Sequence, residues 1–373
     1  MDDKDLFPKQ DTLGYYILEL AAISGEFPAG LLARIPGSAS YKESVITSLK
    51  KNALLRLCYK DKLRGYRLGR RAKSFLLAQR PERFAFYLTG NTDTNRIRSE
   101  VTRRLRLHRT AETYTSMQNA GVAVFRDGKP AVFLPEALAV PPLGSPAFYG
   151  SREIKEMGIE TVKIKSSRMI GALLAPSGIF LTYNSGPSMA KWDYRAELRA
   201  QVFLKIILCH QRLSAQYAAA GISGLLFGDT LEPFYQILSS SDSGSRCFFL
   251  LDGDYEHFYY LTNDRRGDTL LKLLCSPDKT ACLNRILMQG LHDRDPTLPI
   301  ENDATDKNGD PVLFGYFLDI PRINRFHCAL QLQGRTGTLV CFDFQCEVLR
   351  RFCGREAGLS TISFEKFERR FFP

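Results

Sequence analysis

Hydrophobic residues recur at helical spacing through the first part of the chain. Apolar positions three or four residues apart predict a helix over 12–24 and a short second helix over 27–35. The same spacing predicts a third helix over 40–54. The apolar side of this third helix comprises Val45, Ile46, Leu49 and Ala53.

The pattern then changes to strict alternation of apolar and polar residues. LLRLCY and GYRL alternate on either side of KDKLR, which predicts a two-stranded hairpin. The next stretch, GRRAKSFLLAQ, returns to helical spacing. Three short helices followed by a basic hairpin are the order of a winged helix-turn-helix domain, which we assign to residues 1–80.

In such a domain the third helix offers its polar face to the major groove, and the hairpin places cations along the adjacent phosphates. Small hydroxyl side chains and a cation suit base edges or phosphates. Opposite the apolar side of the third helix lie Ser44, Thr47, Ser48 and Lys51. The cations of the hairpin are Arg56, Lys60, Lys62, Arg64 and Arg67. A winged helix that contacts only protein is the alternative, and the basic outer faces favour DNA.

An arginine-rich helix is predicted within the following connecting segment, 81–121. TNRIRSEVTRRLRLHRT (94–110) contains six arginines, and the helix is expected to run for about 27 residues from an N-cap at Asp93. Its apolar seam, which should pack on a neighbouring element, comprises Ile97, Val101, Leu105 and His108. The arginines expected to face DNA are Arg96, Arg103, Arg104, Arg106 and Arg109. Pairing with acidic residues elsewhere in the fold, or a solvated linker helix, is the alternative.

From about residue 121, predicted strands alternate with helices, which indicates an α/β body. VAVFRDGKPAVFL predicts a hairpin around Asp-Gly, and MIGALLAPSGIFLTYN predicts a second hairpin. A polar segment, IENDATDKNGD, separates a body at 122–300 from a C-terminal α/β subdomain at 301–373. The sequence shows no internal repeat. The fold class is therefore α/β, or α+β overall when the N-terminal winged helix is included.

Positive charge is concentrated in the first third of the chain. The net charge is +11, and residues 1–110 contain 22 Lys and Arg against 11 Asp and Glu, a difference of +11. The remaining residues contain 29 of each sign. A localised basic excess on a neutral remainder favours a module that binds a polyanion, and nucleic acid is the partner we expect.

Common catalytic and metal-binding motifs are absent from the sequence. It contains no GxxxxGK[ST], HExxH, GxSxG or CxxC. The histidines do not form the His-hydrophobe-His pair of a rolling-circle relaxase. DATDKNGD lacks the ligands of a calcium loop at its first and twelfth positions. We therefore expect no metal and no cofactor, and an enzyme is the less favoured interpretation.

A Mg²⁺-dependent, restriction-like nuclease is the main alternative. Such a core needs a helix glutamate, a strand aspartate and a nearby lysine. The weak candidates are Glu197 with Asp252 or Asp254, and YEHFYY supplies no lysine. The alternative for Glu197 is a surface ion pair with Arg195, Arg199 or another cation. A degenerate nuclease-like body is a further interpretation.

The cysteines and the N-terminus indicate a reducing compartment. Nine cysteines lie among apolar neighbours, as in IILCH and VCFDF, which is typical of buried free thiols. The chain starts MDDKDLFPKQ, without the apolar stretch of a signal peptide, and no stretch approaches the length of a membrane span. A cytoplasmic protein without membrane contact is expected.

The order of these segments resembles the replication-relaxation family of plasmids and integrated conjugative elements. The resemblance covers about the first 210 residues and rests on ALLRLCYKDKLRGYRLGRRAKSFL, RRLRLHRTAETYTSMQNAGV, AFYGSREIKEM, and FLTYNSG ahead of KWDYRAELRAQ. It implies DNA binding in element replication, relaxation or transfer, beside a separate relaxase or replication protein. It implies no catalytic residues, and residues 311–373 lie outside it.

These observations together predict an accessory protein that binds double-stranded DNA through a winged helix and a basic helix. The α/β body is then a platform for a partner protein or for homodimerisation. A transcription regulator whose body senses a small ligand is a further alternative to the nuclease.

Overall fold

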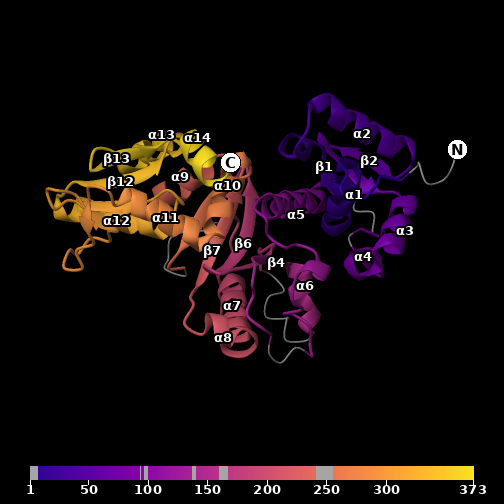
Figure 1. Ribbon diagram of the computed structural model, residues 1–373, viewed down its shortest axis with the longest axis horizontal. Helices are drawn as coiled ribbons and strands as arrows, with labels where there is room; N and C mark the ends of the chain where they lie inside the picture. The colour runs from indigo at the N-terminus through magenta and orange to yellow at the C-terminus, as the bar shows by residue number, and fades with distance from the viewer. Residues whose placement is uncertain (1–6, 93, 96–99, 137–139, 159–166, 241–254) are drawn as a thin grey trace. The chain divides into compact units, whose positions relative to one another are not determined.

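The computed structural model describes residues 7–92, 94–95, 100–136, 140–158, 167–240 and 255–373 (Figure 1). The chain divides into two compact units, the first comprising Met1–Gln118 with Val124–Pro130, and the second Asn119–Ala123 with Ala131–Pro373. Helices and mixed sheets are both present, so the α/β class is confirmed. No helix in the described ranges has the length and apolar character needed to cross a membrane.

The first unit contains a three-stranded antiparallel sheet of order β1-β3-β2. The predicted first and third helices and the predicted hairpin are confirmed. The elements are α1 (Leu13–Ser24), β1 (Phe27–Pro28), the 3-10 helix η2 (Ala29–Arg34), α2 (Ala39–Lys51), β2 (Leu55–Lys60), β3 (Leu63–Leu68), α3 (Arg70–Gln79), α4 (Pro81–Leu88), α5 (Val101–Asn119) and the 3-10 helix η3 (Arg126–Gly128).

Helix α1 lies at the centre of the first unit. The Thr12 hydroxyl accepts a hydrogen bond from the backbone N–H of Tyr15 at 3.4 Å, which caps the start of the helix. The helix ends at Gly25, whose φ of 84° is left-handed and whose N–H donates to the carbonyl of Ala21. Almost every side chain of α1 is buried, so the helix packs on several neighbours at once.

The short second helix predicted over 27–35 is present only over Ala29–Arg34, as the 3-10 helix η2. Phe27 and Pro28 instead form the short edge strand β1, paired with Tyr66 and Gly65 of β3, and a 3-10 helix follows. Proline has no N–H to donate to a ladder and is therefore tolerated at a sheet edge. The short strand extends the hairpin into a three-stranded sheet.

The second unit holds two five-stranded mixed sheets with the same connectivity. In chain order, β4 to β8 pair antiparallel, antiparallel, parallel and parallel. Strands β9 to β13 repeat the same sequence of pairings. The sequence shows no internal repeat, but the strand connectivity of the two sheets is repeated. In both sheets a helix precedes the fourth strand, another precedes the fifth, and a third follows.

The predicted β5–β6 hairpin is confirmed. The first half of the second unit consists of β4 (Ala147–Gly150), α6 (Ser151–Ile154), η4 (Lys155–Met157), β5 (Gly171–Ala175), β6 (Gly178–Gly186), α7 (Tyr194–Lys205), the π-helical η6 (Ile206–Arg212), α8 (Ser214–Tyr217), β7 (Ile222–Gly228), α9 (Glu232–Ser239), β8 (Phe258–Thr262) and α10 (Arg265–Leu274).

The second half begins before the domain boundary that was predicted at residue 300. That boundary falls between β9 and β10, two neighbouring strands of the same sheet. Its elements are α11 (Pro277–Leu287), β9 (His292–Asp293), β10 (Ala304–Thr305), β11 (Pro311–Phe314), α12 (Ile320–Gln333), β12 (Gly337–Phe342), the 3-10 helix η7 (Asp343–Gln345), α13 (Cys346–Cys353), β13 (Ala357–Ile362) and α14 (Phe364–Phe371).

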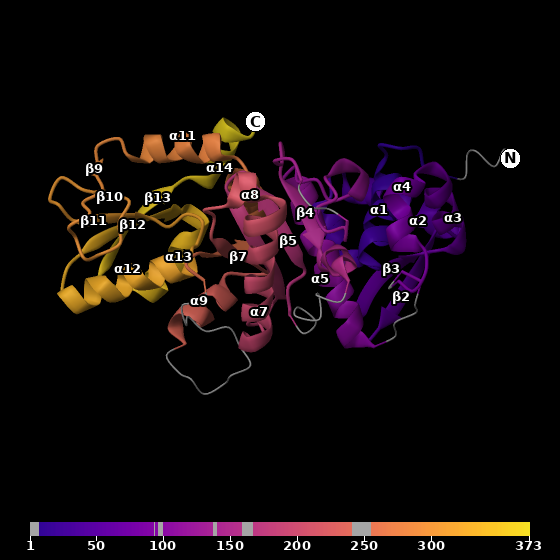
Figure 2. The same ribbon diagram turned by 90° about the horizontal axis from the view of Figure 1, so that it is seen from below.

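Both faces of the second sheet are covered, as Figure 2 shows for α11 on one side and α12 on the other. The side chains of Leu313 and Leu339 join the large core to which Phe326 of α12 also belongs. The alternate residues, Val312 and Val340, pack with Leu287 of α11. Strand alternation therefore directs apolar side chains to both helical layers.

The hairpin predicted around Asp127 and Gly128 is wrong. This segment forms a 3-10 helix and belongs to the first unit. The Asp127 carboxylate accepts hydrogen bonds from Arg80 at 2.5 Å and from Arg83 at 2.9 Å. The Arg83 guanidinium also lies 4.4 Å from the ring centre of Phe125. These long-range contacts override the local turn preference of Asp-Gly.

Candidate nucleic-acid interface

Helix α2 presents a polar face to solvent. The Ser38 hydroxyl caps the helix by accepting from the N–H of Tyr41 at 3.4 Å, and Ile46 and Leu49 are buried. The predicted outward positions Ser44, Thr47, Ser48 and Lys51 are all exposed. Ala53, predicted on the apolar side, is exposed and lies beyond the helix end with a left-handed φ of 55°. The polar face therefore remains available to a ligand along the whole helix.

The β2–β3 hairpin carries its cations outward. Arg56, Lys60, Lys62 and Arg64 are exposed. The two turn residues, Asp61 and Lys62, have φ values of 49° and 64°. Positive φ at both central residues is the backbone of a type I′ turn, whose twist matches that of the strands. The hairpin also exposes apolar surface, with Leu57 48% and Tyr59 67% accessible.

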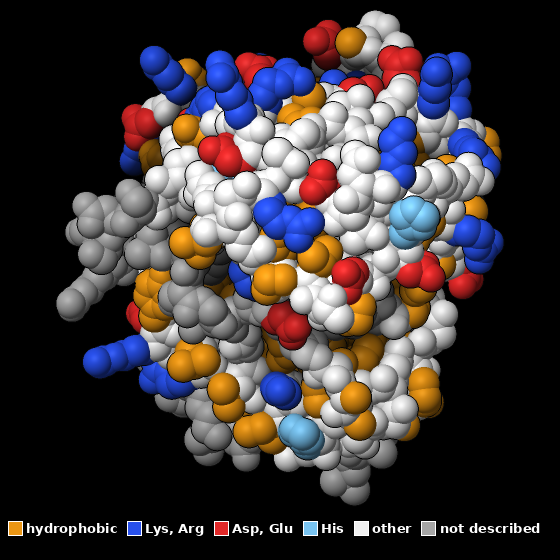
Figure 3. Space-filling view, turned by 90° about the vertical axis from the view of Figure 1, so that its left-hand side faces the viewer, with side chains coloured by type: hydrophobic (Ala, Val, Ile, Leu, Met, Phe, Trp, Pro, Cys, Tyr) orange, Lys and Arg blue, Asp and Glu red, His pale blue; other side chains and the backbone are white. Residues whose placement is uncertain are grey.

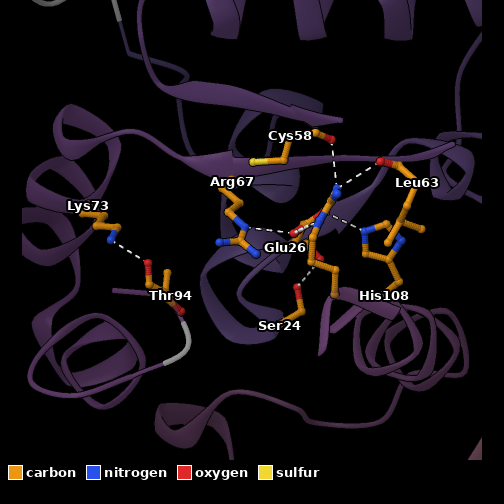
Figure 4. Close-up of polar contacts among 9 residues, drawn as sticks. Ser24, Glu26, Cys58, Leu63, Arg67, Lys73, Thr94 and His108 are labelled. Atoms are coloured by element: carbon orange, nitrogen blue, oxygen red, sulfur yellow. Dashed lines mark hydrogen bonds and ion pairs between the residues drawn. The ribbon is translucent and has the colours of Figure 1, made fainter. Parts of the chain in front are cut away.

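A buried carboxylate, Glu26, organises the interior of this unit (Figure 4). Its oxygens accept hydrogen bonds from Arg67 Nε at 2.8 Å and from Arg104 Nη2 at 2.6 Å. His108 Nε2 lies 2.8 Å from Glu26 Oε1. Arg104 Nη2 also donates to the carbonyls of Cys58 and Leu63, at 2.9 and 3.1 Å. Through Arg104, helix α5 is tied to both strands of the hairpin.

The electrostatics of the cluster favour the charged carboxylate. Burial by itself raises the pKa of Glu26, but the hydrogen bonds from His108, Arg104 and Arg67 outweigh it and lower the pKa to about 2. Gly65 makes the approach possible, because a Cβ at this position would lie 2.3 Å from Glu26 Oε1. Any other residue at 65 would displace the carboxylate.

The predicted orientation of the arginine-rich helix is wrong at Arg104 and Leu105, and its predicted length is wrong as well. Helix α5 begins at Val101 and ends at Asn119, which makes it 19 residues long rather than about 27. Arg104, expected to face DNA, is only 2% exposed, whereas Leu105 of the expected apolar seam is 39% exposed. The inward face instead follows Arg104, His108, Ala111 and Thr115. His108 is buried as predicted, but Arg104 rather than Leu105 faces inward. Its pairing with Glu26 confirms, for this arginine, the alternative of pairing with an acidic residue elsewhere in the fold.

The other predicted arginines have different surroundings. Arg67 is turned toward Glu26, so it is not one of the outward cations of the hairpin. Arg106 is exposed, and Arg103 is exposed while pairing with Glu100 at 2.9 Å. Arg109 is half-buried. Arg96, with the predicted N-cap Asp93 and seam residue Ile97, lies outside the described residues.

Internal pairing removes several acidic groups from the surface of the first unit. Glu26 is fully buried, and Glu19 is 8% exposed with its carboxylate 2.6 Å from Arg83 Nη1. Asp127 is held by Arg80 and Arg83. Because these carboxylates are paired internally, they do not neutralise the exposed cations of α2 and of the hairpin. The positive charge excess of this part of the chain therefore lies at its surface. Figure 3 draws the face that lies on the left in Figure 1, where the C-terminal elements of the second unit are, and there basic and acidic side chains are interspersed.

The nuclease alternative gains no supporting geometry in the second unit. Glu197 is 1% exposed, so the surface ion pair with Arg195 or Arg199 is wrong. Its carboxylate instead accepts from Ser167 Oγ at 2.6 Å and from Tyr183 OH at 3.1 Å, and burial raises its pKa. Asp252 and Asp254 lie outside the described residues. Within the described ranges, no group of three His, Cys, Asp or Glu side chains is placed to hold a metal ion.

The described cysteines are consistent with free thiols. All eight are unpaired, and Cys209, Cys275, Cys341 and Cys353 are buried. Burial raises the pKa of the Cys275 and Cys341 thiols to about 12. The prediction that the cysteines are buried is wrong for Cys328, which is exposed on α12. These buried thiols therefore serve as packing groups.

A histidine–aspartate pair joins the two sheets of the second unit. His257 Nδ1 lies 2.7 Å from Asp319 Oδ2, and the N–H of Phe258 donates to Asp319 Oδ1 at 3.0 Å. The hydrogen bond to Asp319 raises the pKa of His257, burial opposes the rise, and Glu256 and Arg322 act in opposite senses. Sequence patterns did not single out this pair, since its members are far apart in the chain.

This pair predicts a pH-dependent stability of the second unit. Because the folded pKa of His257 is raised, its contribution is fully present below the unfolded pKa of about 6.5 and is lost as pH rises through the folded pKa. The difference in denaturation midpoint between wild type and His257→Gln should therefore shrink from pH 6 to pH 9. His292→Gln, at an exposed position in β9, is the control. A difference that stays constant with pH would contradict the prediction.

Comparison of the chain with protein-family models, with characterised proteins and with solved structures finds no match.

Proposed function

We propose that the first unit binds double-stranded DNA in the manner of a winged helix-turn-helix. Helix α2 reads base edges in the major groove, and the β2–β3 hairpin contacts the phosphates beside it. The observation that carries the proposal is the joint exposure of the polar face of α2 and of four hairpin cations, within the region that holds the whole charge excess of the chain. Arg103 and Arg106 of α5 supply additional exposed cations.

The role of the Glu26 cluster in this proposal is to position the hairpin. Arg104 holds the carbonyls of Cys58 and Leu63, which lie on the two strands that carry the cations. A hairpin fixed in this way loses less conformational freedom when it binds, so more of the phosphate attraction appears as affinity. We propose further, from the family resemblance, that the chain acts as an accessory protein of a mobile element beside a relaxase or replication protein.

The assignment of α2 as the reading helix predicts changes in sequence preference. Thr47→Ala and Ser48→Ala should each relax specificity at particular base pairs, by roughly 1–3 kcal/mol for a good contact. Lys51→Ala should lower affinity for all sequences, because a phosphate contact carries no base information. The measurement is a binding-site selection from a random duplex pool, followed by affinity measurements on the selected sites.

Ser74→Ala offers a matched control for this experiment, because Ser74 is an exposed serine on α3. It should select the same motif as the wild-type chain. Identical motifs from the wild type and from the Thr47 and Ser48 variants would remove α2 as the reading helix.

A further inference from the structure

The repeated connectivity of the second unit provides an internal comparison of two helices. Helix α7 follows the third strand of the first sheet, and α12 follows the third strand of the second. The N-cap residues are Asp193 and Asp319. Positions in the two helices can therefore be matched by counting from these aspartates.

Helix α7 exposes a continuous apolar ridge. Leu198, Val202 and Ile206 are 47%, 50% and 44% exposed. They lie four residues apart, and Ile206 is the first residue of the π-helical segment that continues α7. Side chains at this spacing form one of the ridges by which helices pack into each other's grooves. We call these three residues the α7 ridge.

Cations flank the α7 ridge without compensating charge. Arg195, Arg199 and Lys205 are exposed, and none of them forms an ion pair with another residue of the described ranges. Arg195 lies in the first turn of α7, where the helix dipole disfavours a cation. The acidic residue of the helix, Glu197, is buried. The placement of Arg195 therefore does not serve the stability of the helix, whereas Lys205 lies in its last turn, where a cation is favourable.

The matched positions of α12 differ from α7 in their apolar residues and in the pairing of their cations. In place of the α7 ridge, α12 has Asn324, Cys328 and Leu332, so only the last position is aliphatic. The position of Arg199 is taken by Arg325, which pairs with Glu301 at 2.9 Å. Within one chain, the same place in the topology thus carries either a single exposed aliphatic residue, Leu332, beside a paired arginine, or a three-residue apolar ridge whose cations have no ion-pair partner among the described residues.

We propose that the α7 ridge binds an amphipathic helix of another protein, whose apolar ridge is flanked by carboxylates. Apolar packing along the ridge and charge attraction at its sides are then satisfied by one partner. A second copy of the chain would bring like charges together across a twofold interface. A membrane surface fits less well, because the ridge has no aromatic anchor. The proposal does not depend on DNA binding by the first unit.

The test uses fluorescein-labelled helical peptides and the full chain. One peptide has leucines at every fourth position flanked by glutamates, the second has lysines in place of the glutamates, and the third is a scrambled glutamate peptide. Fluorescence anisotropy should show that the wild type prefers the first peptide to each of the others by at least about tenfold. Arg195→Glu/Arg199→Glu/Lys205→Glu should reverse the preference toward the lysine peptide.

Two further variants separate the ridge from general surface effects. Leu198→Ser/Val202→Ser/Ile206→Ser should lose binding of the glutamate peptide, while Leu332→Ser, at the matched position of α12, should retain it. Circular dichroism checks that each variant folds. Equal binding of the ordered and scrambled peptides, or no binding, would overturn the proposal. So would self-association of the chain, or adsorption to anionic vesicles, that the ridge variant abolishes.

Discussion

Replacing Glu26 with glutamine is expected to lower the free energy of unfolding of the first unit by about 3–5 kcal/mol. The substitution keeps the shape of the side chain but leaves Arg104, 2% exposed, without its counter-charge. Breaking a buried pair is costly because the remaining ion stays desolvated without an opposite charge, and the carbonyls of Cys58 and Leu63 do not neutralise Arg104. Hydrogen exchange of the amides in α1 and β3, measured in the full chain, reports the opening of this unit separately from the second.

Two comparisons isolate the charge pair as the cause. Arg103→Ala removes an exposed arginine from the same helix and should change stability by less than about 0.5 kcal/mol. The double variant Glu26→Gln/Arg104→Met should lose less than the sum of its single variants, since the two residues interact directly. Additive losses, or protection in Glu26→Gln equal to that of the wild type, would contradict the role assigned to the cluster.

The same carboxylate contributes to the response of the first unit to acid. Because the folded pKa of Glu26 is depressed to about 2, its contribution is present above the unfolded pKa near 4.5 and is lost as pH falls toward 2. The wild-type unit should therefore lose stability over this range more steeply than Glu26→Gln.

The hairpin variant Arg56→Ala/Lys60→Ala/Lys62→Ala/Arg64→Ala is expected to reduce the salt dependence of DNA binding strongly. Each phosphate contact releases condensed counterions and contributes about 0.9 to the slope of log K against log salt. Four lost contacts therefore flatten the slope by about 3.6. Affinity at low salt should fall for all sequences alike, while the selected motif stays the same, because phosphate contacts carry no base information.

A variant with the same change in net charge controls for nonspecific attraction. Arg285, Arg294, Lys307 and Lys366 are exposed residues of the second unit. Replacing these four with alanine should leave the slope close to that of the wild type. If both variants flatten the slope equally, the hairpin is not the phosphate-binding element.

Much of the fold could be predicted from local pattern. Helices α1 and α2, the β2–β3 hairpin and the β5–β6 hairpin follow directly from the spacing of apolar residues and from the turn residues between the strands. The predictions fail where contacts with residues far away in the sequence determine the local structure. The segment at Asp127 is held by Arg80 and Arg83, more than 40 positions away, so its Asp-Gly pair does not form the expected hairpin. The repeated topology leaves no trace in the sequence because strand order depends on long-range pairing.

The candidate nucleic-acid interface was likewise predictable where local pattern sets the direction of a side chain, and not where a distant contact does. The outward positions of α2 and four of the five hairpin cations were correctly predicted, whereas Arg67 points inward to Glu26. Pairing of an arginine with an acidic residue was an open alternative, but helical spacing alone could not identify Arg104 as the one that turns inward. Only the position of Glu26 in three dimensions identifies its partner. A glycine in a strand, Gly65, was the one local sign of a close approach.

The most direct measurement of the central claim is the affinity of the full chain for a random duplex pool between about 50 and 200 mM salt. Binding by the exposed cations of the first unit predicts a linear fall of log K with log salt, with a slope of several units that the hairpin variant reduces and the second-unit variant does not. Absence of binding at the lowest salt, or a slope near zero, would contradict the proposal that this unit binds duplex DNA.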